Sequence, residues 1–322
     1  MHQAYLGAGG DKGGGSSGSG TGRQGRRGRH SCRSELHMAP VRGASVRGLF
    51  PRETPGLHLT PSRGRKSAMI EEEPVEEILD DFEAGSGYQR QAVDAALEFR
   101  DETVPHLLAL LQRVVDEPGP WLEEPFRVDH WYAALVLGYL GDADAHGPLI
   151  ELLSLPDEQS FELFADMVAK LFPAFLYRTA AGSFERVEGL LRDRQADPLS
   201  RDAAARSLIY AYAAGVIDRE EVVTRLGRAL AQAQDEGDVE GCTMLANALC
   251  DIGPAELMPQ IQQGYENGLI DSSSLELKDF EEEIERGERA LVETLRQEIA
   301  TRTPADIHGW MGNWSVFDGE SD

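Results

Sequence analysis

The chain has 322 residues, of which 41% are hydrophobic and 27% charged, and its formal net charge is −25. This apolar content is enough to build a sizeable core and excludes wholesale disorder. The charge is uneven: residues 1–68 hold 12 Lys and Arg against 3 Asp and Glu, whereas residues 69–322 hold 19 against 53. Because an acidic body repels phosphates, direct nucleic-acid binding by residues 69–322 is not expected.

The cysteine content and the hydropathy indicate where the protein works. The three cysteines, Cys32, Cys242 and Cys250, form no CxxC pair and cannot build a disulfide framework, as is typical of a reducing compartment. No run of about 18 apolar residues is present to span a bilayer. The first ten residues lack the charged and apolar regions of a signal peptide. We therefore expect a cytoplasmic protein that does not contact a membrane.

Residues 1–68 differ in composition from the rest and contain fifteen glycines among scattered arginines. Such a segment buries too little surface to offset its chain entropy, so we expect a disordered tail. As a functional element it would be a basic tail that contacts nucleic acid or an acidic partner. The alternative is translated upstream sequence, with the true start at Met69, where MIEEEPVEE begins an acidic helix. The predicted domain is residues 69–322.

From Met69 onward nearly every segment has helical periodicity, and Pro and Gly fall between the segments. The first predicted helix has Pro74 in its opening turn, ends near Gly85 and carries one apolar stripe. It is expected to cap the N-terminal end of the domain. The residues of the stripe are Val75, Ile78, Leu79 and Phe82.

The following segments repeat one pattern: a helix rich in Ala and Gly, a short turn, and a second helix with a ladder of Leu, Ile and Val. The first ladder residues are spaced by 42, 38, 35 and 35 positions, which is the range of two-helix repeats. A single globular bundle explains this less well, because a bundle has no reason to repeat the turn signals. The sequence therefore predicts an all-α solenoid of about five helix pairs. The ladder positions are Leu107, Leu149, Val187, Val222 and Leu257.

A C-terminal cap is predicted from Lys278, where KDFEEEIERGERALVETLRQEIA begins. Its apolar residues recur at helical spacing and would cover the last pair. They are Phe280, Ile284, Leu291, Leu295 and Ile299.

Two motifs carry a resemblance to known proteins. LGDADAHGPLIELL, at residues 140–153, resembles HEAT-like repeats of the phycobilisome-lyase type. The region 69–317 resembles the bacterial DUF1186 family, whose closing motif is similar to ADIHGWMGNWSVF at residues 305–317. Here Asp306 precedes Ile307, and Trp314 stands where the family usually has a Trp pair. Some relatives continue into a SEC-C zinc motif, which does not follow here. The resemblance implies a helical-repeat fold and says little about activity.

Aromatic residues are the candidate partner-binding sites. Trp310, Trp314 and Phe317 could anchor a partner, since Trp is enriched at binding hot spots. Alternatively, this tail folds back and closes the open end of the array, because exposed Trp clusters promote aggregation. Trp121, in a Pro-broken loop, and Trp131 are further candidates; Trp121 would edge a groove or cover the first pair.

Candidates for catalysis or metal binding are weaker. Asp142, Asp144 and His146 form a DxDxH that could ligate a divalent metal, but helix capping accounts for Asp in such a turn. The Glu runs near residues 71–73 and 281–285 are typical of solvated helix faces. No GxSxG, P-loop or GxGxxG is present. We therefore expect no catalytic, cofactor or metal site.

Three functions fit these observations. The leading hypothesis is a non-enzymatic scaffold that binds a protein or peptide, with a basic partner favoured by the acidic body. The second is an enzyme or lyase-like accessory protein with unidentified carboxylates. The third is an acidic mimic of nucleic acid that sequesters a basic protein.

Overall fold

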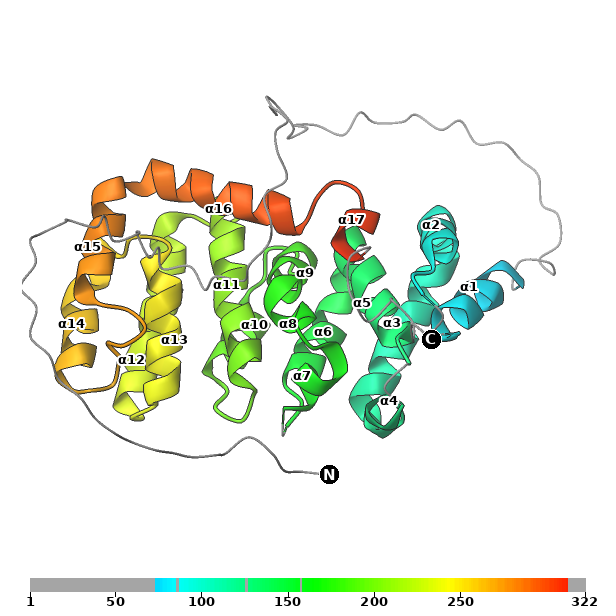
Figure 1. Cartoon of the computed structure of the whole chain (residues 1–322), viewed down its shortest axis with the longest axis horizontal. Coiled ribbons are helices and arrows are strands. Elements are labelled where there is room, and N and C mark those ends of the chain that lie inside the picture. Colours follow the sequence, from blue (N-terminus) through cyan, green and yellow to red (C-terminus); the bar gives the residue numbers. More distant parts are fainter. Residues whose placement is uncertain (1–72, 85–86, 125–126, 157, 312–322) are drawn as a thin grey trace, which may run out of the picture.

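The computed structural model describes residues 73–84, 87–124, 127–156 and 158–311 (Figure 1). Every regular element in these ranges is helical, and none of the described residues is in a strand. The predicted all-α class is therefore confirmed. The predictions for residues 1–68, for Trp314 and for Phe317 lie outside the described residues.

The helices pair into five repeats, and these pairs form a row (Figure 1). First helices contact the first helices of neighbouring pairs, and second helices contact second helices, as expected for stacked repeats. The first helices are α2 (Arg90–Glu98), α5 (Asp129–Leu140), α9 (Phe172–Thr179), α11 (Pro198–Ala214) and α13 (Val239–Cys250). The second helices are α3 (Arg100–Asp116), α6 (His146–Leu153), α10 (Glu185–Arg192), α12 (Arg219–Asp235) and α14 (Met258–Glu266).

The predicted ladder residues mostly occupy the core between these layers. The first four are fully buried, but Leu257 is half-buried and belongs to the short 3-10 helix η2 (Ala255–Leu257). At the N-terminal end α1 (Glu73–Glu83) packs on α2 and α5, and Phe82 stacks on Tyr132 with ring centroids 4.4 Å apart. The periodicity does not predict four short helices. Between pairs lie α4 (Gly119–Glu123), α7 (Gln159–Phe164) and α8 (Met167–Lys170), and η1 (Ala143–Ala145) joins α5 to α6 within a pair.

The first helices are buried on nearly all sides. In α5 every residue from Asp129 to Gly138 is buried, and α11 is almost as completely covered. Small residues permit this packing: a Cβ on Gly138 would lie 2.2 Å from the Phe175 ring of α9. A helix enclosed in this way must be covered by a third layer as well as by the second helices.

The C-terminal segment supplies that layer. The helix expected from Lys278 is broken at Gly287, which has φ of 78°, into α15 (Leu277–Arg286) and α16 (Glu288–Arg302). Helix α15 packs on α13 and covers the last pair, whereas α16 turns back across α11 and leads to α17 (His308–Met311) (Figure 1). Arg296 Nε donates to the Ala213 carbonyl at 2.7 Å. We call residues 288–311 the C-terminal strap.

Candidate functional site

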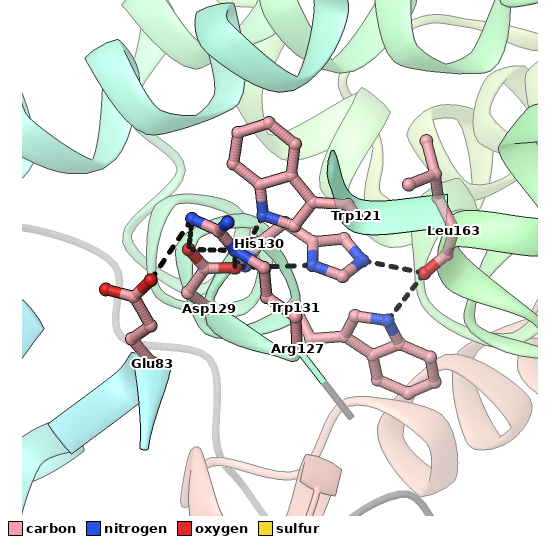
Figure 2. Close-up of polar contacts among 7 residues, drawn as sticks. All are labelled: Glu83, Trp121, Arg127, Asp129, His130, Trp131 and Leu163. Atoms are coloured by element: carbon pink, nitrogen blue, oxygen red, sulfur yellow. Dashed lines mark hydrogen bonds and ion pairs between the residues drawn. The ribbon is translucent and has the colours of Figure 1, made fainter. Parts of the chain in front are cut away.

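A buried polar cluster lies where α5 begins (Figure 2). Asp129 is 4% exposed, and its Oδ1 accepts hydrogen bonds from Trp121 Nε1 at 2.6 Å and from the His130 backbone at 2.9 Å. Its Oδ2 accepts from Arg127 Nη2 at 3.2 Å. The Arg127 guanidinium also lies 4.3 Å from the Trp121 ring centroid and 3.4 Å from Glu83 Oε1, which links α4 and α5 to α1.

These donors decide the charge of the carboxyl. Burial by itself raises the pKa of Asp129, but hydrogen bonds from His130, Arg127 and Trp121 outweigh it and hold that pKa below the ordinary value. Asp129 is therefore an ionised, buried carboxylate paired with Arg127. Such a group stabilises the fold only while every donor stays in place.

The carbonyl of Leu163 in α7 joins a second part of the cluster. It accepts from Trp131 Nε1 at 2.6 Å and from His130 Nε2 at 2.8 Å, so His130 carries its proton on Nε2. The other nitrogen, Nδ1, lies 3.6 Å from Asp129 Oδ1 and makes no hydrogen bond. His130 is 2% exposed, so a substrate would not reach this Asp–His pair. The hydrogen bonds of this cluster instead hold α4 and α7 against the start of α5.

Further polar contacts continue along the same side of the array. Ser160 of α7 hydrogen-bonds Ser200 of α11 at 3.0 Å, and Arg201 Nη2 of α11 donates to Asp238 Oδ2 at 2.7 Å. Asp238 is the N-cap of α13, where its Oδ1 accepts from Gly241 N. Burial raises the pKa of Asp238, and hydrogen bonds from Gly241 and Arg201 more than offset this and lower it.

We call this side the helix-start edge, because α5, α11 and α13 begin on it. It comprises residues 119–131, 158–164, 197–201 and 236–240, and Figure 1 shows α4, α7 and the α10–α11 and α12–α13 connections along one edge of the row. Its buried contacts are polar, but three large apolar side chains are exposed on its surface. They are Phe161, Leu199 and Val239.

The structure brings Trp121 and Trp131 into one cluster but places Trp310 elsewhere. Trp121 and Trp131 lie at the helix-start edge and are 7% and 5% exposed. Trp310 is 3% exposed and lies in the C-terminal strap. A partner-binding role for these three residues, and for Trp314 and Phe317 outside the described ranges, stays a prediction.

Trp310 folds back onto the side of the array. Its ring stacks on Phe175 at 5.9 Å between centroids, meets Tyr139 edge-on at 5.3 Å, and donates Nε1 to the Pro304 carbonyl at 2.6 Å. Arg178 lies 5.5 Å from the same ring. The indole thus covers α5 and α9 in the middle of the row, not the open end of the solenoid.

The DxDxH residues make hydrogen bonds within the helical array. Asp142 Oδ1 accepts from the Asp144 backbone at 3.0 Å and caps η1, and His146 Nδ1 is 3.0 Å from Thr179 Oγ1. Burial, and then nearby Arg186, lower the pKa of His146. Within the described ranges no group of three or more His, Cys, Asp or Glu side chains is placed to hold a metal ion.

A cavity of about 640 Å³ lies apart from these residues, between α12 and η2. Its apolar wall is formed by Val223, Gly227 and Leu257. An ion pair between Arg219 and Glu256, at 3.0 Å, lies beside this wall. Sequence reasoning missed both this cavity and the Asp129 cluster. Asp129 and His130 could have been noticed as a polar pair that opens an otherwise apolar helix.

Comparisons with known proteins give a family and no activity. The profile described as "Protein of unknown function (DUF1186)" matches residues 73–318. Uncharacterized proteins of Chlamydia trachomatis serovar D and Chlamydia muridarum are each 22% identical over 208 residues, which covers 64% of this chain and 82% and 83% of the relatives. No solved structure matches. No described helix is long and apolar enough to cross a membrane. The chain belongs to the DUF1186 family.

Proposed function

We propose that the protein is a non-enzymatic scaffold that binds a basic protein or peptide. One observation carries the proposal: many of the arginines of the helical domain are engaged in ion pairs between its own repeats. They include Arg201–Asp238, Arg206–Asp251, Arg219–Glu256 and Arg225–Glu188.

In these pairs carboxylates of the same domain neutralise the arginines, so the arginines do not make the surface positive. Since residues 69–322 have 19 basic and 53 acidic side chains, the remaining surface charge is strongly negative. Such a field speeds encounter with positive partners and disfavours negative ones. The repeat architecture adds an extended surface, which is what helical arrays commonly use to bind proteins.

The test is affinity capture on the full chain at two salt concentrations, with DNA as competitor. A basic partner that is retained at low salt and released at high salt supports the scaffold, because surface electrostatics are screened by ions. If DNA displaces that partner, the protein acts as a nucleic-acid mimic. Equal retention of acidic and basic proteins at both salt concentrations would contradict the proposal.

A further inference from the structure

We infer that the exposed row Phe161, Leu199 and Val239 on the helix-start edge is the docking surface for a basic amphipathic helix of the partner. This inference rests on the proposed function and assigns it a surface and a ligand class. It depends on the placement of the row, its exposure and the charge that surrounds it.

The three side chains come from neighbouring helices that are joined by hydrogen bonds. Phe161 follows Ser160, and Leu199 precedes Ser200, and these serines are hydrogen-bonded at 3.0 Å. Val239 follows Asp238, which pairs with Arg201 of the same α11 turn. The three residues therefore follow one another along the edge from α7 to α11 to α13.

The row is unusual in its exposure. In the described part of the chain five large apolar side chains are exposed, and three of them are Phe161 at 39%, Leu199 at 39% and Val239 at 47%. Each sits in the first turn of a helix, next to one residue that is buried and hydrogen-bonded. These residues are Ser160, Ser200 and Asp238. A rigid apolar row costs little to order on binding, which favours its use as an interface.

Acidic side chains surround the row. Exposed glutamates lie at the start of α7 (Glu158, Glu162) and at the start of α13 (Glu236, Glu240). The exposed cations at the α10–α11 connection are Arg192, which pairs with Glu188, and Arg194. Helix N-termini carry about half a positive charge each. Here Asp197 caps α11, and Asp238, which is paired with Arg201, caps α13, so these two helix starts add little positive charge to the edge.

The dimensions fit a short helix. Packed helices lie about 8–10 Å apart, so three consecutive helices present apolar contacts over about 20 Å. A helix rises 1.5 Å per residue, so about 14 residues cover that length, with apolar side chains about one heptad apart on one face. Lys or Arg on the flanks of that face would meet the carboxylates. Nucleic acid and anionic lipid lack this combination of apolar and positive groups.

The experiment uses the full chain and a fluorescein-labelled 18-residue peptide with leucines on one helical face and lysines elsewhere. Binding is followed by anisotropy for the wild type and for Phe161→Ser, Leu199→Ser and Val239→Ser. Each variant should bind about tenfold more weakly, as loss of an apolar anchor does at other interfaces. The matched control is Val216→Ser, because Val216 is 50% exposed in the α11–α12 connection, at the opposite end of α11.

Charge is tested separately with the triple variant Glu158→Gln, Glu162→Gln and Glu240→Gln. It should weaken binding and reduce its salt dependence. The control triple Glu281→Gln, Glu282→Gln and Glu285→Gln removes equal charge from exposed positions of α15 and should change binding less. A scrambled peptide of the same composition, without an apolar face, should bind more weakly than the amphipathic one.

The outcomes separate this inference from the proposed function. If the peptide binds and the row variants bind it equally well, the surface is wrong while the scaffold proposal stands. If neither peptide binds at low salt, the proposed function fails as well. Cross-links from residues 1–68 to the helix-start edge would make the chain's own basic segment the occupant and overturn the assignment to a partner.

Discussion

Single buried charges hold the first helices in register, and Asp129 is the clearest case. Its carboxylate receives hydrogen bonds from Trp121, Arg127 and the His130 backbone, and so connects α4 to α5. Removing one partner of a buried ion pair leaves the other uncompensated, which is more costly than losing a surface pair.

We therefore expect Asp129→Asn to lower the free energy of unfolding by about 3 kcal/mol, measured by urea denaturation at pH 7. Because the pKa of Asp129 is lowered in the fold, its contribution is present above the unfolded pKa and is lost as pH falls through the folded value. The difference from wild type should shrink below about pH 4. Asp101→Asn, at an 84% exposed side chain paired with Arg100, should change stability by less than about 0.5 kcal/mol.

The pKa of Asp251 is shifted in the opposite direction from that of Asp129. The net pKa of Asp251 is raised to about 6: burial, the largest cause, raises it, Arg206 lowers it, and Glu298 and Asp202 raise it. For a carboxyl whose folded pKa is raised, stability is greatest below the unfolded pKa and is lost as pH rises through the folded pKa.

Asp251→Asn should therefore gain stability relative to wild type as pH rises from 4.5 to 7.5, measured by urea denaturation at both values. Exposed Asp235→Asn serves as the control and should give parallel curves. A constant difference between Asp251→Asn and wild type across this range would contradict the raised pKa.

Glycines within the helices differ in how closely a neighbouring helix approaches them. Gly138 of α5 is buried, and an added Cβ would lie 2.2 Å from Cδ1 of Phe175. Gly189 of α10 is also within a helix, but an added Cβ meets nothing within 4 Å. The same substitution should thus have opposite effects at the two sites.

We expect Gly138→Ala to destabilise the protein by about 1–3 kcal/mol through overpacking between α5 and α9. Gly189→Ala should stabilise it by about 0.5–1 kcal/mol, since alanine restricts the unfolded chain and favours helix. Thermal unfolding of both variants measures the effect. Equal shifts of the same sign would show that α5 and α9 are not packed this closely.

Across the whole molecule, the C-terminal strap joins the last repeat to the first. His308 hydrogen-bonds Tyr88, 220 positions earlier in the chain, and its Nε2 lies 2.9 Å from Asp94 Oδ1 in α2. Tyr212 donates to Glu288 at 2.6 Å near the start of α16. Repeat arrays depend mainly on contacts between neighbours, so such a strap adds long-range cooperativity.

Trp310→Ala should lower the free energy of unfolding by about 3–5 kcal/mol, because it removes a large buried ring from between the strap and the array. Hydrogen exchange should accelerate in α2 and α5 more than in α13. Trp310→Phe keeps an aromatic ring against Phe175 but loses the bond to Pro304, and should cost less. Uniform acceleration along the chain would argue against a local strap contact.

The helical class, the helix pairs and the family resemblance follow from local patterns in the sequence. Apolar residues at helical spacing decide which side of each helix is buried, and the ladder at Leu107, Leu149, Val187 and Val222 is buried accordingly. These are local patterns, so they can be read without knowing which segments meet.

Long-range packing sets what covers the first helices and which polar groups are buried. The turn at Gly287 sends α16 back along the array, and Trp310 meets Phe175 from a distant part of the chain. Asp129 forms a buried ion pair with Arg127, which helical periodicity does not predict. The physical reason is that periodicity specifies an apolar face but not its partner, which long-range packing selects.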